Sequence, residues 1–285
     1  MLRFENLKIK DTQIAKDAIF NKKMSKNSFY STVKKSITYF MLLKSVYIVL
    51  NNDEKIGILL IDSSNREIYF YPLEESSNNI NFNEFINSAK ERFSLKEYTF
   101  NFNCREIKDI DTFEKDYEII NSVKFMKCDL NNNYNVFSNL NTSNEFNIRK
   151  YTLKQDEKIR VELQNQIFNS VKGRSELTLK DVMMEEYSPR FIEDMCFILE
   201  SNEKAIGYGQ IINLNESFYL ANFGVISDFR GKGCGRYLLH YIMLMCYKKD
   251  MEEIYLTVDN NNFSAIKLYA SNGFYEIKNN VKIKL

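Results

Sequence analysis

The sequence predicts an α/β (α+β) protein built from two domains. Its 285 residues are close to twice the length of an average domain. The second half alternates strand-like patterns with amphipathic stretches of helical length, which is typical of domains that mix helices and sheet. Two short anchors of that half recur in the first half at almost the same separation, which indicates an internal repeat.

The composition excludes several classes of protein. With 44% hydrophobic and 27% charged residues the chain has enough apolar material for a sizeable core. Its 39 Lys and Arg residues nearly cancel its 38 Asp and Glu residues, which argues against a dedicated nucleic-acid binder because such proteins carry a basic excess. No apolar run reaches the roughly 18 residues that span a bilayer, and no apolar signal segment follows the first residues. We therefore expect a cytoplasmic protein that binds neither nucleic acid nor membrane.

Cysteine and histidine usage argues against a metal centre. The five cysteines form neither a C-x-x-C pair nor a zinc-ligand spacing, so we expect free thiols in a reducing compartment. The single histidine, His240, excludes sites that need several imidazoles and argues against a Ser-His-Asp hydrolase. His240 stands among apolar helical positions, which favours a structural role. We expect no bound metal.

The first elements of the second half follow from apolar spacing and from residues that interrupt it. Residues 146–153 alternate as a strand, and residues 155–169 have helical periodicity. Gly173 breaks the pattern, and Thr178 is a suitable N-cap for a second helix at 177–187. The predicted order is strand, helix, helix.

Turn signals separate the remaining elements. Two polar turns join three strands, and an apolar helix, a buried strand and a second helix follow before the final β-structure. In chain order these are strands at 196–200, 205–214 and 218–225, a helix at 236–249, a strand at 253–258, a helix at 262–271 and β-structure at 274–285.

The first half resembles a degenerate copy of the second. Gly57 follows a Glu-Lys pair as Gly207 does, and Phe125 ends a segment similar to the one that Phe274 ends. Gly57 and Phe125 stand 68 residues apart, and Gly207 and Phe274 stand 67 apart. The two matched pairs indicate a duplication with a period of about 150 residues.

The boundary between the copies is predicted in the Asn-rich polar stretch 131–144, whose composition is that of a linker. We therefore predict a degenerate domain at 1–135 and a complete domain at 145–285. The first copy has no glycine at 74–83, where the second copy has a glycine cluster. The first domain is accordingly predicted to lack a phosphate loop.

That cluster, Gly231, Gly233 and Gly235, follows an apolar strand and opens an amphipathic helix. A helix N-terminus attracts phosphate through its unpaired N–H groups and its dipole, and glycines let the phosphate approach. The segment does not match a Walker loop, because Lys232 is followed by glycine and not by Ser or Thr. It does not match the dinucleotide-binding motif either, because Arg236 stands where that motif has its third glycine. The pattern that remains is Arg-x-x-Gly-x-Gly, although an ordinary strand–turn–helix with incidental glycines stays open.

A second motif stands 27 residues after Gly235. It reads, in register, Asn262-x-x-Ala265-x-x-Leu268-Tyr269-x-x-x-Gly273-Phe274. Asn262 is suited to cap a helix, and Gly273 to take the left-handed conformation that ends one. In this order and spacing, the two motifs resemble those of the GNAT acyltransferase superfamily. The resemblance covers residues 146–285 well and the first half only as a degenerate copy, as in tandem-GNAT proteins.

The resemblance implies two domains, each with a mixed, mostly antiparallel central sheet flanked by helices. It also implies acetyl-CoA as co-substrate and an acyl transfer without an enzyme-bound intermediate. The strands 218–225 and 253–258 would splay, and a main-chain N–H near Val225 would stabilise the oxyanion. The implied cofactor-binding residues are Phe223, Gly224 and Val225 for pantetheine, Arg230, Gly231, Lys232, Gly233, Cys234, Gly235 and Arg236 for the diphosphate, and Asn262.

Tyr269 matches the general acid of the family, a phenol that protonates the departing CoA thiolate. The alternative is that its ring packs helix against sheet. Asn262 is a pantetheine ligand, a helix cap or both, and Cys234 is expected to be a small loop residue rather than a nucleophile.

The general base stays open. The strand 218–223 has no carboxylate, so a base acting through water and an amine that arrives neutral are both alternatives. The candidate carboxylates, each expected to be solvated, are Glu176, Glu185, Glu186 and Glu216.

The leading functional hypothesis is an acetyl-CoA-dependent N-acyltransferase whose acceptor is the amine of a small molecule or peptide. The alternative is a regulatory protein that binds acyl-CoA without turnover, which the missing strand carboxylate favours and Tyr269 disfavours. A third hypothesis, transfer of aminoacyl groups from tRNA, is disfavoured by the balanced charge. The sequence does not name the acceptor.

Overall fold

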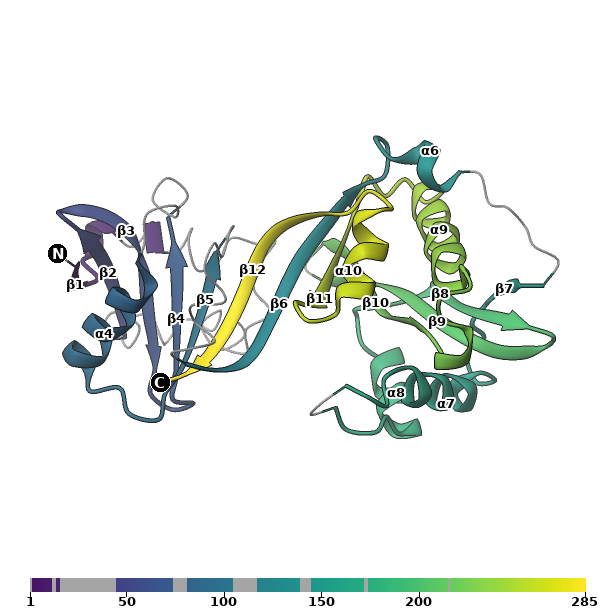
Figure 1. Ribbon diagram of the computed structural model, residues 1–285, viewed down its shortest axis with the longest axis horizontal. Coiled ribbons are helices and arrows are strands. Elements are labelled where there is room, and N and C mark those ends of the chain that lie inside the picture. Colours follow the sequence, from purple (N-terminus) through teal and green to yellow (C-terminus); the bar gives the residue numbers. More distant parts are fainter. Residues whose placement is uncertain are drawn as a thin grey trace. The chain divides into compact units, whose positions relative to one another are not determined.

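The computed structural model describes residues 2–11, 14–15, 45–73, 81–104, 117–138, 145–171, 174–214 and 216–285. The chain divides into two compact units (Figure 1). Unit 1 comprises residues 1–125 together with 276–285, and unit 2 comprises residues 126–275. None of the helices in the described ranges is both long and apolar enough to cross a membrane.

Unit 1 is a sheet covered by one described α-helix. Its strands are hydrogen-bonded neighbours in the order β1-β2-β3-β4-β5-β12-β6. The pairs from β1 to β4 and the pair β5–β12 are antiparallel, whereas β4 and β5 are parallel. The described elements are β1 Leu2–Asn6, η1 Ile9–Asp11, β2 Val46–Asn51, β3 Glu54–Asp62, β4 Glu67–Pro72, α4 Phe82–Phe93, β5 Thr99–Cys104, β6 Glu118–Asp129 and β12 Tyr275–Lys284.

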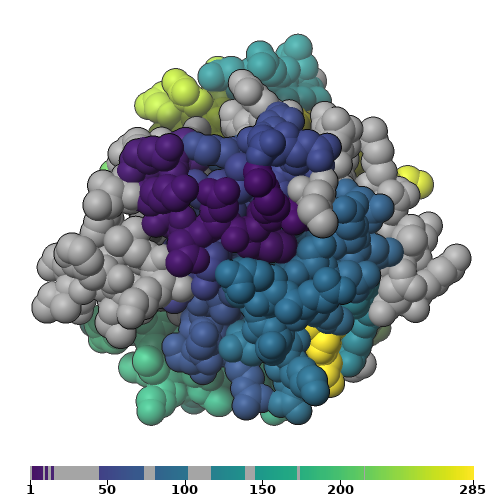
Figure 2. All heavy atoms as spheres, turned by 90° about the vertical axis from the view of Figure 1, so that its left-hand side faces the viewer, coloured from purple at the N-terminus to yellow at the C-terminus, as the bar shows by residue number. Residues whose placement is uncertain are grey.

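The sheet of unit 1 is apolar on both faces. Along β3, Leu59 and Ile61 pack in the cluster that contains α4, while Ile58 and Leu60 pack in a second cluster. This division follows from the two-residue period of a strand. Figure 2 shows the face of unit 1 where the purple residues of β1 lie beside the blue residues of its partner β2.

Unit 2 holds both sequence motifs. Its strands follow the order β7-β8-β9-β10-β11-β6, antiparallel from β7 to β10 and parallel between β10 and β11. The division between the units falls inside β6. The remaining elements of unit 2 are α6 Tyr134–Phe137, β7 Asn147–Lys150, α7 Glu157–Ile167, α8 Leu179–Glu186, β8 Phe191–Ser201, β9 Lys204–Leu214, β10 Ser217–Val225, η3 Ser227–Phe229, α9 Cys234–Tyr247, β11 Glu253–Asp259 and α10 Phe263–Ala270.

The helices of unit 2 cover its sheet on both faces, α7 and α8 on one and α9 and α10 on the other (Figure 1). Glycines in the sheet permit the helices to approach it closely. A Cβ on Gly209 would lie 2.7 Å from Ile242 of α9, and one on Gly224 would lie 2.3 Å from Ile167 of α7. Both distances are shorter than van der Waals contact, so the sheet needs glycine at these two points.

The order of elements in unit 2 agrees with the sequence predictions. Every predicted strand and helix from residue 146 onward has a counterpart, with ends that differ by a few residues. Thr178 is the N-cap of α8 and forms a capping box with Asp181, as expected. The fold class, a mixed and mostly antiparallel sheet flanked by helices, is confirmed.

The two units share a topology. Each has an antiparallel series of strands followed by a parallel pair joined through a helix, β4-α4-β5 in unit 1 and β10-α9-β11 in unit 2. The strands β3 and β9 begin 150 residues apart, at Glu54 and Lys204. Gly57 and Gly207 occupy the fourth position of these strands, so the first anchor marks equivalent places.

The second anchor does not mark equivalent structure. Residues 119–125 lie in the strand β6, whereas Leu268 lies in α10 and Gly273 in the turn after it. The compact units also differ from predicted domains at 1–135 and 145–285, because the last ten residues pack in unit 1. The placement of this last strand depends on pairing between distant segments, which local composition does not report.

Candidate active site

The strands β10 and β11 separate at the centre of unit 2. They are parallel neighbours, and their pairing is registered at Tyr219 and Tyr255. β10 continues six residues further, to Val225. The later part of β10 is therefore paired with β9 on one edge, and its other edge is not paired with β11.

A β-bulge lies at this separation. Ala221 pairs with Gln210 and Gly224 with Tyr208, so β10 holds one residue more than β9 across this interval. Within it, Asn222 has a φ of 51°, a left-handed conformation that asparagine tolerates better than most residues. The extra residue of the bulge changes the direction in which the following side chains of β10 point.

The main chain of Val225 faces the free edge. The N–H of Ile226 donates to Ile206 O of β9 at 2.9 Å. Because successive N–H groups of a strand point to opposite edges, the N–H of Val225 points away from β9. Its carbonyl lies on that same side, where it accepts a hydrogen bond from Arg230 Nε at 2.9 Å.

The glycine cluster forms the turn into α9. Gly231 and Gly233 have φ values of 74° and 84°, and nothing lies within 4 Å of a Cβ placed on either. Gly233 is the N-cap of α9 and has no side chain to cap it. The N–H of Tyr237 makes the first helical hydrogen bond, to Gly233 O. The preceding N–H groups, of Cys234, Gly235 and Arg236, therefore have no acceptor within the helix.

The first turn of α4 in unit 1 differs at the same point. There Asn81 is the N-cap, and its side chain accepts a hydrogen bond from the N–H of Glu84 at 3.1 Å. Glu84 also places a negative charge in the first turn. Both features disfavour an anion at this end of α4. Residues 74–80 of the predicted glycine-free region lie outside the described residues.

The side chain of Arg230 connects the glycine loop to β10 and to α7 by hydrogen bonds. Besides the bond to Val225 O, its Nη2 donates to Ile167 O at the end of α7, at 2.8 Å. The guanidinium thus fixes the loop through two carbonyl oxygens and keeps its positive charge there. Lys232 is exposed, and its Nζ lies 5.2 Å from the centre of the Phe229 ring.

Tyr269 lies in the last turn of α10, and its ring is buried between Phe223 and Phe274. Burial raises the pKa of the phenol well above its usual value, so the hydroxyl is protonated at neutral pH. Among the described residues no group hydrogen bonds to this hydroxyl, which is also absent from the fully buried polar atoms that lack a partner. The buried hydroxyl is accordingly protonated and has no acceptor among the described residues.

The two ends of α10 are capped as the motif predicts. Asn262 is the N-cap, and its Oδ1 accepts a hydrogen bond from the N–H of Ala265 at 3.1 Å. At the other end Gly273 has a φ of 89°, and the N–H of Phe274 donates to Tyr269 O at 3.1 Å, which is a Schellman ending.

His240 of α9 supports this ending. Its Nε2 lies 2.6 Å from the Oδ1 of Asn272, and Asn272 is 2% exposed. Since the Nδ2 of Asn272 donates to Leu268 O, the Oδ1 accepts and the histidine nitrogen donates. The predicted structural role of His240 therefore fits its contacts.

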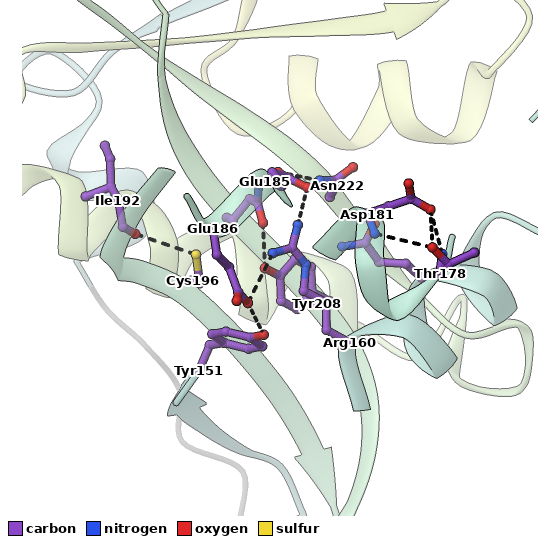
Figure 3. Close-up of polar contacts among 12 residues, drawn as sticks. Tyr151, Arg160, Thr178, Asp181, Glu185, Glu186, Ile192, Cys196, Tyr208 and Asn222 are labelled. Atoms are coloured by element: carbon purple, nitrogen blue, oxygen red, sulfur yellow. Dashed lines mark hydrogen bonds and ion pairs between the residues drawn. The ribbon is translucent and has the colours of Figure 1, made fainter. Parts of the chain in front are cut away.

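The helix α8 brings a carboxylate to the β10 bulge (Figure 3). Oε1 of Glu185 accepts a hydrogen bond from Gln210 Nε2 at 2.5 Å and lies 3.5 Å from Asn222 Nδ2. Its Oε2 accepts from Arg160, whose side chain is fully buried. Glu185 is thus not a solvated surface residue, contrary to the sequence expectation.

Glu186 contacts the same arginine, since its Oε1 lies 4.0 Å from Arg160 Nη1. Its Oε1 accepts a hydrogen bond from the Tyr151 hydroxyl at 2.5 Å, and its side chain is 10% exposed. Burial raises the pKa of this carboxyl. The other two candidate carboxylates, Glu176 and Glu216, are exposed.

Cys234 is fully buried at the start of α9, and burial raises the pKa of its thiol. A raised pKa disfavours the thiolate, so the position agrees with a small packing residue rather than a nucleophile. Among the described residues no group of three or more His, Cys, Asp or Glu side chains is arranged to hold a metal ion.

The comparisons with known proteins agree with this geometry. The sequence model of the acetyltransferase (GNAT) family matches residues 163–274, which contain the splayed strands, the glycine loop and α10. Residues 163–274 are thus similar to a GNAT domain. The family indicates acyl transfer as the chemistry. No curated protein matches the chain.

Solved structures resemble the chain over its whole length. A GCN5-related N-acetyltransferase from Sphaerobacter thermophilus has 14% identity and a TM-score of 0.58, covering 100% of this chain and 95% of that one. A GNAT-family acetyltransferase from Colwellia psychrerythraea has 11% identity and a TM-score of 0.54, with 100% and 99% coverage. A tandem GNAT protein from the clavulanic acid biosynthesis pathway has 11% identity and a TM-score of 0.53, with 100% and 98% coverage. At these identities the likeness concerns the fold.

Proposed function

We propose that this chain transfers an acetyl group from acetyl-CoA to an amine. The observation that carries the proposal is the set of uncapped N–H groups at the start of α9, which opens beside the free edge of β10. Tyr269 supplies a protonated phenol in the same unit. A GNAT domain that retains all three parts is equipped for turnover rather than for binding alone.

The loop suits a diphosphate. The positive φ of Gly231 and Gly233 and the open space around them leave the first-turn amides of α9 accessible to phosphate oxygens. In the proposed complex Gly231, Lys232, Gly233, Cys234, Gly235 and Arg236 donate main-chain N–H groups, and Arg230 adds positive charge while it fixes the loop.

The free edge of β10 suits the pantetheine arm. In the proposal the arm pairs with the main chain of Phe223, Gly224 and Val225, and Asn262 binds it from the start of α10. The N–H of Val225, which points to the free edge, donates to the thioester carbonyl as negative charge develops on its oxygen. A preorganised donor of this kind contributes about 3 kcal/mol to transition-state stabilisation.

The proton balance assigns a role to Tyr269. The neutral amine attacks the thioester carbonyl, the C–N bond forms and the C–S bond breaks. The phenol of Tyr269 gives its proton to the departing sulfur and regains one from solvent. The nitrogen loses one proton as the amide forms, so the products are the acetylated amine and free CoA.

We further propose that a degenerate copy at 1–135 binds no acetyl-CoA, whereas the domain at 145–285 does. The capped first turn of α4 supports this division, since Asn81 and Glu84 occupy the place that phosphate would need.

The test is direct. Acetyl-CoA binding is measured by calorimetry, and CoA release is followed with a thiol reagent in the presence of a panel of amines. Micromolar binding with amine-dependent CoA release supports an acetyltransferase. Binding without release from any amine supports the alternative, an acyl-CoA-binding regulatory protein, and no binding contradicts both.

A further inference from the structure

The segment between α7 and α8 carries an arginine without a paired carboxylate. Arg174 is exposed, and among the described residues no carboxylate forms an ion pair with it. Partial burial of its guanidinium lowers the pKa of Arg174, and the negative charge of Glu185 opposes this effect. Glu185 itself is bonded to Arg160. A cation that is partly desolvated and unpaired attracts an anion more strongly than a fully solvated one.

The guanidinium of Arg174 is held in a defined plane. Its central carbon lies 3.9 Å from the centre of the Phe168 ring, and its Nη2 donates to Gln164 Oε1 at 3.3 Å. The main-chain N–H of Arg174 donates to Val171 O at 3.2 Å, which fixes the backbone. A guanidinium has five N–H donors, and one that stacks on a ring keeps its edge available for a planar partner. Arg174 is thus oriented before any ligand binds.

Hydrogen-bond donors exceed acceptors around this arginine. The amide of Gln164 is 1% exposed, and its Nε2 has no partner among the described residues. One turn earlier in α7, Nε and Nη1 of the fully buried Arg160 also lack a hydrogen-bond partner there. The two nearby carboxylates, Glu185 and Glu186, both contact Arg160. The group that this cluster lacks is therefore an acceptor with negative charge, whereas an ammonium ion would add donors.

The arginine stands at the end of α7 that contacts the proposed CoA site. Phe168, on which Arg174 stacks, directly follows Ile167. The carbonyl of Ile167 accepts a hydrogen bond from Arg230 of the glycine loop, and its side chain lies 2.3 Å from a Cβ placed on Gly224. Gly224 belongs to the part of β10 beyond the registered pairing with β11. An anion bound by Arg174 therefore lies on the side of unit 2 where we propose the thioester.

Resting on the proposed function, we propose that Arg174 binds a carboxylate of the acceptor, so the substrates are amines that also carry a carboxylate, such as amino acids. The two oxygens of a carboxylate match two parallel N–H groups of a guanidinium. A phosphate dianion suits the position less well, because the negative charge of Glu185 already acts on Arg174. Arg174 determines specificity in this proposal and takes no part in proton transfer.

The experiment compares amino acids with their carboxamides. CoA release is measured for a set of amino acids, β-alanine included, each beside its carboxamide, and phosphoethanolamine represents amines with a phosphate. Wild type should show kcat/KM values at least tenfold higher for the acids. Arg174→Met, which keeps an apolar contact with Phe168, should raise KM for the acids about 10- to 100-fold and leave KM for the carboxamides within twofold. The control Arg190→Met, which changes another exposed arginine, should leave all values within twofold.

Acetyl-CoA affinity, measured by calorimetry, separates this proposal from the proposed function. Arg174→Met should bind acetyl-CoA within twofold of wild type, and a thermal melt verifies its fold. Weaker acetyl-CoA binding by this variant would place the arginine at the cofactor and overturn the assignment. Equal or better turnover of carboxamides or phosphoethanolamine by wild type, or an equal rise of KM for acids and carboxamides in Arg174→Met, overturns it as well and leaves the proposed function intact.

The remaining outcomes are also decisive. Wild type that binds no acetyl-CoA, or that binds it without CoA release from any amine, overturns both proposals. Should Arg174→Met not fold, Arg174→Lys takes its place. This variant keeps the positive charge and loses the planar fork, so it must raise KM for the acids alone.

Discussion

A charge placed at Gly233 tests how α9 binds its ligand. Gly233 has a φ of 84°, a conformation that asparagine and aspartate tolerate better than other residues, and a Cβ there meets nothing within 4 Å. Gly233→Asn and Gly233→Asp therefore share backbone strain, bulk and the ability to cap the helix. They differ by one negative charge.

The expected difference follows from Coulomb's law. A carboxylate on residue 233 would lie about 6 Å from a diphosphate held by the first-turn amides, and in water each pair of unit charges at that distance repels by roughly 0.7 kcal/mol. Two phosphate charges give about 1.4 kcal/mol, which is about a tenfold loss of affinity.

Calorimetry with acetyl-CoA at low salt measures this difference. Gly233→Asn should bind more weakly than wild type because its side chain competes for the amides, and Gly233→Asp should bind about tenfold more weakly again. The gap should shrink as salt is added. Equal affinity of the two variants, or wild-type affinity of both, would refute the placement of the diphosphate.

Further predictions concern Tyr269, Gly273 and Arg230. Tyr269→Phe keeps the ring between its two aromatic neighbours, so the melting temperature should stay within a few degrees while kcat falls about 10²-fold or more and acetyl-CoA affinity is unchanged; a melting temperature that falls with kcat would support the packing role instead. Gly273→Ala forces a φ of 89° on alanine and presses on the Asn133 side chain at 2.4 Å, so urea unfolding should show a loss of about 2–3 kcal/mol, against about 1 kcal/mol for Gly231→Ala, which meets nothing. Arg230→Met removes two hydrogen bonds to carbonyl oxygens and a positive charge, and it should weaken acetyl-CoA binding at least tenfold; an unchanged affinity would mean that the loop keeps its form without them.

The sequence predicted the parts of this site that are local. The conformation of Gly273 and the caps at Asn262 and Thr178 depend on neighbouring residues, so spacing alone indicates them. The turn at Gly231 and Gly233 is local in the same sense, and the structure gives both the left-handed conformation expected of glycine.

The parts that depend on distant contacts were not predictable in this way. Arg160 stands on the buried face of α7 beside Leu163 and Ile167, although a charged residue is normally expected in solvent. Its spacing of three from Leu163 and seven from Ile167 was the available signal. Glu185 was expected to be solvated because glutamate is usually exposed. Its actual partners lie on three other elements, so local spacing does not indicate them. The final strand β12 likewise packs in unit 1 through a pairing that no local pattern reports.

The most direct test of the account is a crystal structure of the chain with CoA. The account predicts diphosphate oxygens within hydrogen-bond distance of the N–H groups of Gly235 and Arg236, and the pantetheine arm along β10 at Val225. CoA bound in unit 1, or bound in unit 2 with its diphosphate away from the start of α9, would contradict it.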